Sequence, residues 1–284
     1  MKFQPRIAFT DIDGTLLDKD RGVSAVTKKA VAQLTQRNLP FILISSRMPR
    51  AMTHLQADLN ISGAPLIAYN GGLVLDARGD ALSSQAIQLT TVNDIAEFAT
   101  ALNLVTMLYH HDEWYVTERE HYALREENNT RTAATVQDLS TTLADWKERQ
   151  IGAHKVMAMG VPEGIDALVG QLTDAYGSRL HLYRSKDDYL EIADAQISKL
   201  TGVQTLLEAC YPDLTLADCV AFGDNYNDVE MLAGVGLGVA VANAREEVKA
   251  VADLHVAGNK EDGVAEGLTK IFDQRQRTSG PIPK

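Results

Sequence analysis

The 284-residue chain carries 27 Lys and Arg residues against 38 Asp and Glu residues, a formal net charge of −11. This acidic balance disfavours nucleic acid and anionic membranes as partners, because both require a basic contact surface. The length suffices for one large α/β domain or two smaller domains. No apolar run could span a bilayer, no signal peptide is recognisable, and neither Cys210 nor Cys219 lies in a CxxC pair. We therefore expect a cytoplasmic protein.

Strand and helix signals alternate through the first third of the chain. A short apolar run at residues 7–9 ends just before Asp11 and Gly14, which is typical of a buried strand that breaks into a loop. Helical spacing of apolar residues predicts a helix over residues 25–37. A strand over 41–44, a helix over 48–59 and a strand over 66–69 are expected to follow. This order predicts a parallel sheet with right-handed crossovers.

The middle of the chain has a different pattern. Helix-like stretches at residues 92–102 and 165–176 are mixed with strand-like stretches at 114–116, 155–159 and 180–183. The parallel pattern then resumes, with helices predicted over 200–209 and 228–232 and strands over 219–222 and 237–241. We therefore predict an α/β fold, with a core domain of residues 1–85 and 190–284 that is interrupted by an α+β domain of residues 86–189.

Three predicted strands end in polar residues that a plain core does not need: residues 10–15 (TDIDGT), 45–47 (SSR) and 223–228 (GDNYND). Ligands bind beyond the carboxyl ends of strands in open α/β sheets, so these segments should meet. The site would hold Asp11, Asp13, Asp224 and Asp228, and such carboxylates repel one another unless a cation lies among them. Oxygen ligands in small number favour Mg²⁺. A single Asp is more often a helix cap or turn residue, but the joint pattern favours a site.

These segments resemble motifs of the haloacid dehalogenase (HAD) superfamily phosphatases. Residues 11–17 resemble motif I, residues 222–232 resemble motif IV of the Cof-type branch, and Glu191-Ile192 with Ser198-Lys199 is similar to the motif III lysine segment. Residues 69–72 (YNGG) and 261–265 (EDGVA) also match that branch. The resemblance covers about 1–85 and 190–270. It implies a Rossmann-like parallel-sheet core with an inserted C2-type cap (subfamily IIB) that sets substrate specificity.

The resemblance also implies a mechanism, that of a Mg²⁺-dependent phosphatase acting on small phosphorylated metabolites such as sugar phosphates. Asp11 would attack phosphorus and form an aspartyl-phosphate, and Asp13 would serve as general acid and then as general base. Lys199, together with the metal, would neutralise the negative charge that would otherwise repel the anionic nucleophile. The metal would be held by Asp11, the Asp13 backbone carbonyl and Asp224, with Asp228 behind them. The phosphate would be bound by the backbone of Ile12 and by Ser45, Ser46, Lys199 and Asn227.

Some positions keep more than one interpretation. Ser46 stands where the family usually has a glycine, which alters how closely the backbone approaches a phosphate. Arg47 could contact substrate or pair with an acidic residue. His110 and His111 would point to opposite faces of a strand, which disfavours a shared zinc ion and leaves contact with substrate as the alternative.

Three functions remain open at this point. The first is hydrolysis of phosphomonoesters, the second is a phosphotransferase or phosphomutase on the same core, and the third is a binding module without turnover. Product analysis with and without an acceptor sugar separates the first two. The sequence determines neither the substrate nor whether the protein is a monomer or a homodimer.

Overall fold

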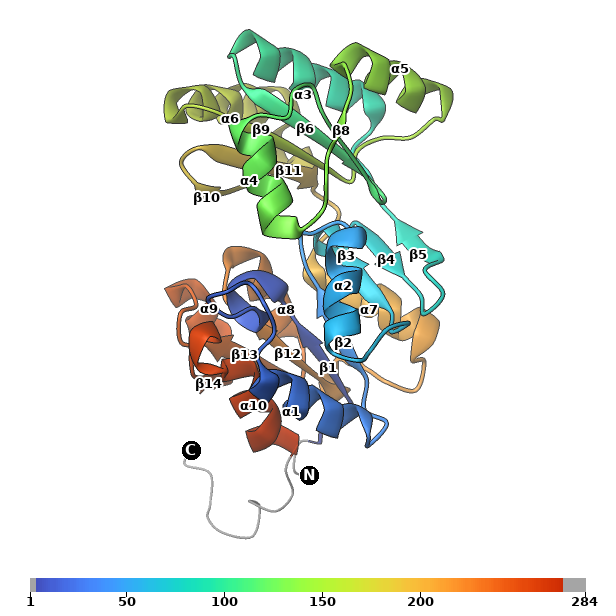
Figure 1. The fold of residues 1–284 in the computed structure, drawn as a ribbon, viewed down its shortest axis with the longest axis vertical. Helices are drawn as coiled ribbons and strands as arrows, with labels where there is room; N and C mark the ends of the chain where they lie inside the picture. Colours follow the sequence, from blue (N-terminus) through green and yellow to red (C-terminus); the bar gives the residue numbers. More distant parts are fainter. Residues whose placement is uncertain (1–3, 273–284) are drawn as a thin grey trace. The chain divides into compact units, whose positions relative to one another are not determined.

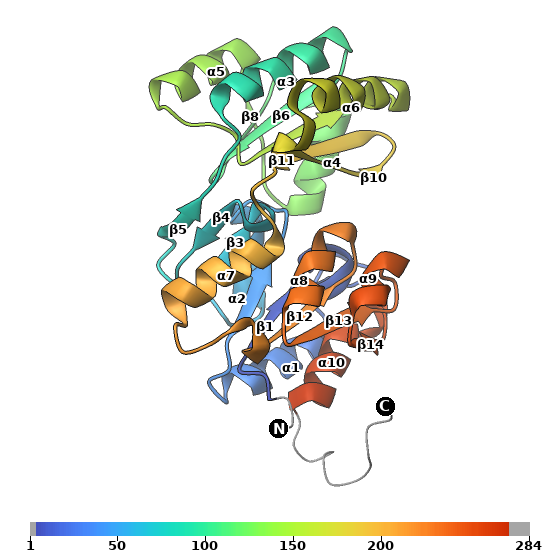
Figure 2. The same ribbon diagram turned by 180° about the vertical axis from the view of Figure 1, so that it is seen from behind.

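The computed structural model describes residues 4–272, and its ribbon is drawn from opposite sides in Figures 1 and 2. The chain forms two compact units. Among the described residues, the first consists of residues 4–45, 52–82 and 198–272, and the second of residues 46–51 and 83–197. The expected insert, residues 86–189, lies within the second unit, whereas the expected core domain extends past the last described residue. Over residues 4–272, no helix has both the length and the hydropathy that a membrane crossing requires.

An eight-stranded sheet forms the centre of the first unit, in the order β14-β13-β12-β1-β2-β3-β4-β5. The pairs β1–β12, β1–β2, β2–β3, β12–β13 and β13–β14 are parallel, and β3–β4 is antiparallel. This arrangement confirms the predicted α/β class. The strands are β1 (Ile7–Thr10), β2 (Phe41–Ile44), β3 (Leu66–Ala68), β4 (Leu73–Leu75), β5 (Ala81–Ser84), β12 (Cys219–Gly223), β13 (Leu237–Val241) and β14 (Leu254–Val256).

Helices cover both faces of this sheet, which explains why β1, β2 and β12 are buried along their whole length. Helix α1 packs against α10 on one face, and α7 packs against α8 on the other (Figures 1 and 2). Helix α1 starts at its predicted residue because the Ser24 side chain accepts a hydrogen bond from Thr27 N. The helices are α1 (Ala25–Thr35), α2 (Arg50–Asp58), α7 (Lys199–Cys210), α8 (Val229–Gly234), α9 (Glu246–Val251) and α10 (Gly263–Phe272).

The second unit has its own sheet and its own core. Its six strands have the order β10-β11-β9-β6-β7-β8 and are antiparallel except for the pair β7–β8. Side chains of α3, α5 and α6 pack on this sheet around Trp146 and Leu168, which are fully buried. The elements are β6 (Val105–His110), β7 (Glu113–Val116), β8 (Thr135–Val136), β9 (Lys155–Met159), β10 (Leu180–Lys186), β11 (Tyr189–Asp194), α3 (Leu89–Ala101), α4 (His121–Thr130), α5 (Leu139–Glu148) and α6 (Pro162–Tyr176).

Candidate active site

The first unit places three of the polar strand ends next to one another. Asp11 follows β1, Ser45 follows β2 and Asp224 follows β12, and β1 lies between the other two strands in the sheet. Parallel strands present their carboxyl ends at one edge, which is where open α/β sheets bind ligands. The backbone N–H of Asp11 donates to Phe222 O at 3.0 Å, so the parallel register of β1 and β12 extends to the carboxylate-bearing residues.

The turn after Asp11 is shaped to approach Asp224. Residues Ile12–Leu16 form a short π-helical turn in which Gly14 has φ +86°. A Cβ atom on Gly14 would lie 2.3 Å from Asp224 Oδ2, so only glycine fits this position. Thr15 Oγ1 donates to Asp224 Oδ1 at 2.8 Å. In the first motif, Gly14 therefore leaves room for the Asp224 carboxylate of motif IV, and Thr15 holds that carboxylate by a hydrogen bond.

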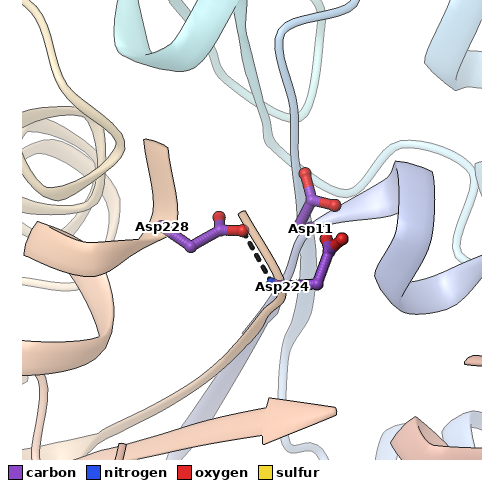
Figure 3. A group of neighbouring side chains, drawn as sticks. All are labelled: Asp11, Asp224 and Asp228. Atoms are coloured by element: carbon purple, nitrogen blue, oxygen red, sulfur yellow. Dashed lines mark hydrogen bonds between the residues drawn. The ribbon is translucent and has the colours of Figure 1, made fainter. Parts of the chain in front are cut away.

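Asp11, Asp224 and Asp228 form a compact carboxylate cluster, which Figure 3 shows. One oxygen from each side chain lies within 4.8 Å of the others. Asp11 is 5% exposed and Asp228 is fully buried. Asp228 Oδ2 accepts hydrogen bonds from the backbone N–H of Asp224 at 2.9 Å (Figure 3) and from that of Asn225 at 3.0 Å. Asp228 thereby fixes the loop that carries Asp224.

Lys199 lies between two of these carboxylates and has no exposed surface. Its Nζ donates to Asp11 Oδ1 at 2.5 Å and to Asp228 Oδ1 at 2.6 Å. Burial disfavours the charged ammonium, but attraction to the two aspartates outweighs it, and the pKa of Lys199 is raised. Helix α7 begins at Lys199 because the Ser198 side chain accepts from Thr201 N, which places the lysine at the buried end of the helix.

The cluster carries more negative charge than Lys199 can balance. Burial raises the pKa of Asp11 well above its usual value, and repulsion from Asp228 and Asp224 adds to this effect against the attraction of Lys199. Burial, followed by repulsion from Asp228, raises the pKa of Asp224 to about 6. A divalent cation would relieve this repulsion, and carboxylate oxygens are the ligands that Mg²⁺ prefers. Asp11 and Asp224 thus fit the metal ligands expected from the sequence.

The carboxylate of Asp13 is not part of the group that Asp11, Asp224 and Asp228 form, although Asp13 follows Asp11 by only two residues and its charge acts on Asp224. Its side chain is 41% exposed, and its Oδ1 accepts a hydrogen bond from Arg21 Nη2 at 2.8 Å. A proton donor must lie within hydrogen-bond reach of the group that it protonates, and a carboxylate with exposed surface is accessible to a bound molecule. Arg21 carries no sequence signal that singles it out, because its pairing with Asp13 depends on the path of the loop after the first motif.

The predicted phosphate-binding residues separate into two groups. Ser45 and Asn227 both lie in the first unit and are joined through Asn70. The Asn70 backbone N–H donates to Ser45 O at 2.8 Å, and Asn227 Nδ2 donates to Asn70 Oδ1 at 2.9 Å. Ile12 is fully buried at the start of the π-helical turn. Ser46, in contrast, groups with the second unit, where its carbonyl accepts from Lys155 Nζ at 3.1 Å.

The three residues whose roles stayed open also belong to the second unit. Arg47 is 5% exposed and donates to the backbone carbonyls of Ala51 and Asn129, each at 3.2 Å. His110 Nδ1 lies 2.8 Å from Gly152 O, and the backbone N–H of His111 donates to His154 Nδ1 at 3.2 Å. These contacts give each residue a structural partner.

Comparison with known proteins gives matches that extend over most of the chain. A family model described as haloacid dehalogenase-like hydrolase matches residues 8–268. A protein of Yersinia pestis named HMP-PP phosphatase is 29% identical over 279 residues, which are 97% of this chain and 98% of that protein. A haloacid dehalogenase-like hydrolase of Bacteroides thetaiotaomicron superposes with a TM-score of 0.86 at 24% identity, over 95% of this chain and 100% of that chain. A HAD subclass IIB sugar phosphatase superposes with a TM-score of 0.77 at 19% identity, over 94% and 98% of the two chains.

Proposed function

Because the chain belongs to the haloacid dehalogenase-like hydrolases and is a phosphatase, we propose that it hydrolyses small phosphorylated metabolites with Mg²⁺ through a phosphoenzyme on Asp11. The observation that carries the proposal is the position of Asp11. Its buried carboxylate is held by Lys199 at the carboxyl end of β1, within 4.8 Å of Asp224.

Asp11 is the nucleophile in this proposal. The hydrogen bond from Lys199 to Oδ1 holds the carboxylate in one orientation and reduces the repulsion that a negatively charged phosphoryl group would meet. A carboxylate oxygen of Asp11 forms a bond to phosphorus while the bond between phosphorus and the leaving oxygen breaks. The phosphate oxygens are bound by the backbone of Ile12 and by Ser45, Ser46, Lys199 and Asn227.

Asp13 moves the protons in both steps. It donates a proton to the leaving oxygen as the phosphoenzyme forms. It then takes a proton from the water that attacks phosphorus, which breaks the bond to Asp11 and releases inorganic phosphate. The exposure of the Asp13 side chain, 41%, supports this role, because a leaving group and a water molecule can both reach its carboxylate.

Asp11, Asp224 and the backbone carbonyl of Asp13 would hold Mg²⁺, while Asp228 fixes the loop of Asp224. When bound, the ion supplies positive charge that stabilises the transferring phosphoryl group. The close approach of the Asp11, Asp224 and Asp228 carboxylates supports this assignment, because a divalent cation would relieve the repulsion among them.

The substrate class is proposed from the relatives and from the second unit. The names of the Yersinia pestis protein and of the subclass IIB structure refer to HMP-PP and to sugar phosphates. We propose sugar phosphates or similar phosphomonoesters as substrates here, with specificity set by residues 86–189. The thiols of Cys210 and Cys219 are unbridged, which is typical of a reducing compartment, and we propose a cytoplasmic location.

A panel of phosphomonoesters with detection of free phosphate tests the proposal. We expect hydrolysis with Mg²⁺, loss of activity after EDTA treatment and recovery when Mg²⁺ is restored. Asp11→Asn should abolish turnover by several orders of magnitude, whereas Asp20→Asn should not, because Asp20 pairs only loosely with Lys19 at 3.3 Å on the surface. Activity that survives in Asp11→Asn would refute the nucleophile, and transfer to an acceptor sugar without phosphate release would favour a phosphotransferase.

A further inference from the structure

The turn Tyr69–Gly71 after β3 has an unusual backbone. Three consecutive residues adopt positive φ values, +52° at Tyr69, +56° at Asn70 and +101° at Gly71. Such angles are uncommon for residues with a side chain, above all for a bulky one such as Tyr69, and they persist only where neighbouring structure enforces them. Asn70 is 2% exposed. The turn coincides with the YNGG sequence that resembles the Cof-type branch but has no part in the proposed chemistry.

Asn70 connects two separate parts of the phosphate-binding region. Its backbone N–H donates to Ser45 O at 2.8 Å, and its side-chain Oδ1 accepts from Asn227 Nδ2 at 2.9 Å. Asn70 follows β3, whereas Asn227 follows β12, and β1 and β2 lie between these strands in the sheet. One residue, through its backbone and its side chain, therefore joins the loops of Ser45 and Asn227, which follow strands on opposite sides of β1.

The same turn also contacts the helix that carries Lys199. A Cβ atom on Gly71 would lie 2.3 Å from Ser198 O and 3.3 Å from Gly202 N. The backbone of the turn thus packs directly on the first turn of α7. The position of Asn70 is consequently fixed relative to the buried lysine as well as to the two loops.

The orientation of the Asn227 amide depends on this contact. An amide side chain has a donor end and an acceptor end, and the torsion that exchanges them is soft. Because Asn70 Oδ1 accepts one N–H of Asn227, the amide nitrogen is held on the side of the turn and keeps a second N–H for another acceptor. Rotation by about 180° would instead direct the Asn227 oxygen, which repels an anion, to the place of that nitrogen.

We propose that Asn70 is a positioning residue for the phosphate, acting by holding Asn227 with its donor end available and by holding the Ser45 loop. The inference rests on the proposed function, in which Ser45 and Asn227 bind the phosphate. Asn70 itself does not touch the reacting atoms. Its loss should therefore weaken the binding of phosphate more than it slows the chemical step.

The variant Asn70→Gly removes the side-chain oxygen while keeping the backbone N–H and tolerating the positive φ. The matched control is Asn60→Gly, because Asn60 is exposed and also has a positive φ, +55°. Calorimetric titration with inorganic phosphate in the presence of Mg²⁺ measures binding, and steady-state kinetics separates KM from kcat. We expect Asn70→Gly to raise the dissociation constant and KM about 3- to 10-fold with a smaller change in kcat. Asn60→Gly should match the unchanged protein.

A double-mutant cycle with Asn227→Ala isolates the mechanism. If Asn70 acts through Asn227, Asn70→Gly should add little to the loss already caused by Asn227→Ala. Equal phosphate affinity of Asn70→Gly and the unchanged protein, or full additivity in the cycle, would overturn the inference. If Asn70→Gly does not fold, Asn70→Ala removes the same side-chain oxygen and replaces it in the titration and in the cycle, with the same non-additivity expected.

The same titration separates this inference from the proposed function. Absence of phosphate binding and of hydrolysis in the unchanged protein would overturn the proposed function, and the inference with it. Binding and hydrolysis by the unchanged protein, with no effect of Asn70→Gly, would overturn the inference alone.

Discussion

The substitution Lys199→Met should be among the most damaging single changes in the first unit. Lys199 Nζ bonds Asp11 at 2.5 Å and Asp228 at 2.6 Å, and neither Lys199 nor Asp228 has side-chain surface exposed to water. Methionine retains much of the volume but leaves two buried carboxylates without their cation. Breaking a buried ion pair by removing one partner costs roughly 3–5 kcal/mol. We expect a loss of that order in the free energy of unfolding at neutral pH without Mg²⁺.

The loss should depend on pH and on Mg²⁺ in a defined direction. Burial already raises the pKa of Asp11, and removal of Lys199 should raise it further. When the pKa of a carboxyl group is higher in the folded protein than in the unfolded chain, the group adds to the free energy of unfolding at a pH below its pKa in the unfolded chain. This stabilisation is lost as the pH rises through its pKa in the folded protein. The deficit of Lys199→Met should therefore shrink as the pH falls, and Mg²⁺ should reduce it at neutral pH.

Urea denaturation can follow the two units separately. The chain has two tryptophans, Trp114 and Trp146, and both are buried in the second unit. Tryptophan fluorescence therefore reports the second unit, whereas far-ultraviolet circular dichroism reports both. We expect Lys199→Met to lower the denaturation midpoint seen by circular dichroism, with a smaller effect on the fluorescence transition.

The control for this experiment is Lys28→Met. Lys28 lies 3.8 Å from Asp58, and both side chains are about two-fifths exposed at 39% and 43%. Exposed pairs contribute about 0–1 kcal/mol. If Lys199→Met is no more destabilised than Lys28→Met, the reasoning about an uncompensated buried charge cluster is wrong.

Three further predictions concern other parts of the chain. Burial, with repulsion from His110 and His111, lowers the pKa of His154 from 6.5 to about 3. The second unit should therefore lose stability as the pH falls from about 6.5 towards 3. In urea titrations followed by fluorescence, His154→Gln should make the stability of the second unit less dependent on pH. Gly14→Ala should weaken Mg²⁺ activation at least tenfold, because the new Cβ would displace Asp224; unchanged activation would contradict this. Lys155→Met should destabilise the second unit by roughly 1–3 kcal/mol, because its hydrogen bond to Ser46 and its contact with Glu191 at 3.8 Å are lost.

Residues 46–51, which follow β2 and Ser45, belong to the second unit. Lys155 holds the Ser46 carbonyl, and Arg50 donates from its backbone N–H to Asp112 Oδ1 at 2.7 Å. Ser45, immediately before this segment, belongs to the first unit. The unit boundary therefore falls inside the predicted phosphate loop. Ser46, which stands where the family usually has a glycine, belongs to the second unit, and its carbonyl accepts a hydrogen bond from Lys155 of β9 in that unit's sheet.

The sequence by itself determined the α/β class and the pairing of the first and last motifs. Parallel strands buried on both faces are continuous apolar runs, and polar residues at their ends stand out against such runs. Asp11 after residues 7–10 and Asp224 after residues 219–223 could be recognised for this reason. The rule that ligands bind beyond these strand ends then predicted their proximity, which the cluster of Asp11, Asp224 and Asp228 confirms.

The resemblance named Lys199 and Asn227 as site residues, but only the tertiary structure decided which contacts hold them in place. Lys199 lies 188 residues from Asp11, and Asn227 lies 157 residues from Asn70, so no local pattern reports either contact. A lysine near a helix start is usually solvated, and an asparagine in a turn is usually explained by its backbone conformation. Burial of Lys199 between carboxylates and the reach of Asn70 to Asn227 depend on how the helix and the turn pack on the sheet. Long-range packing sets these contacts, because it alone brings together groups that the chain keeps far apart.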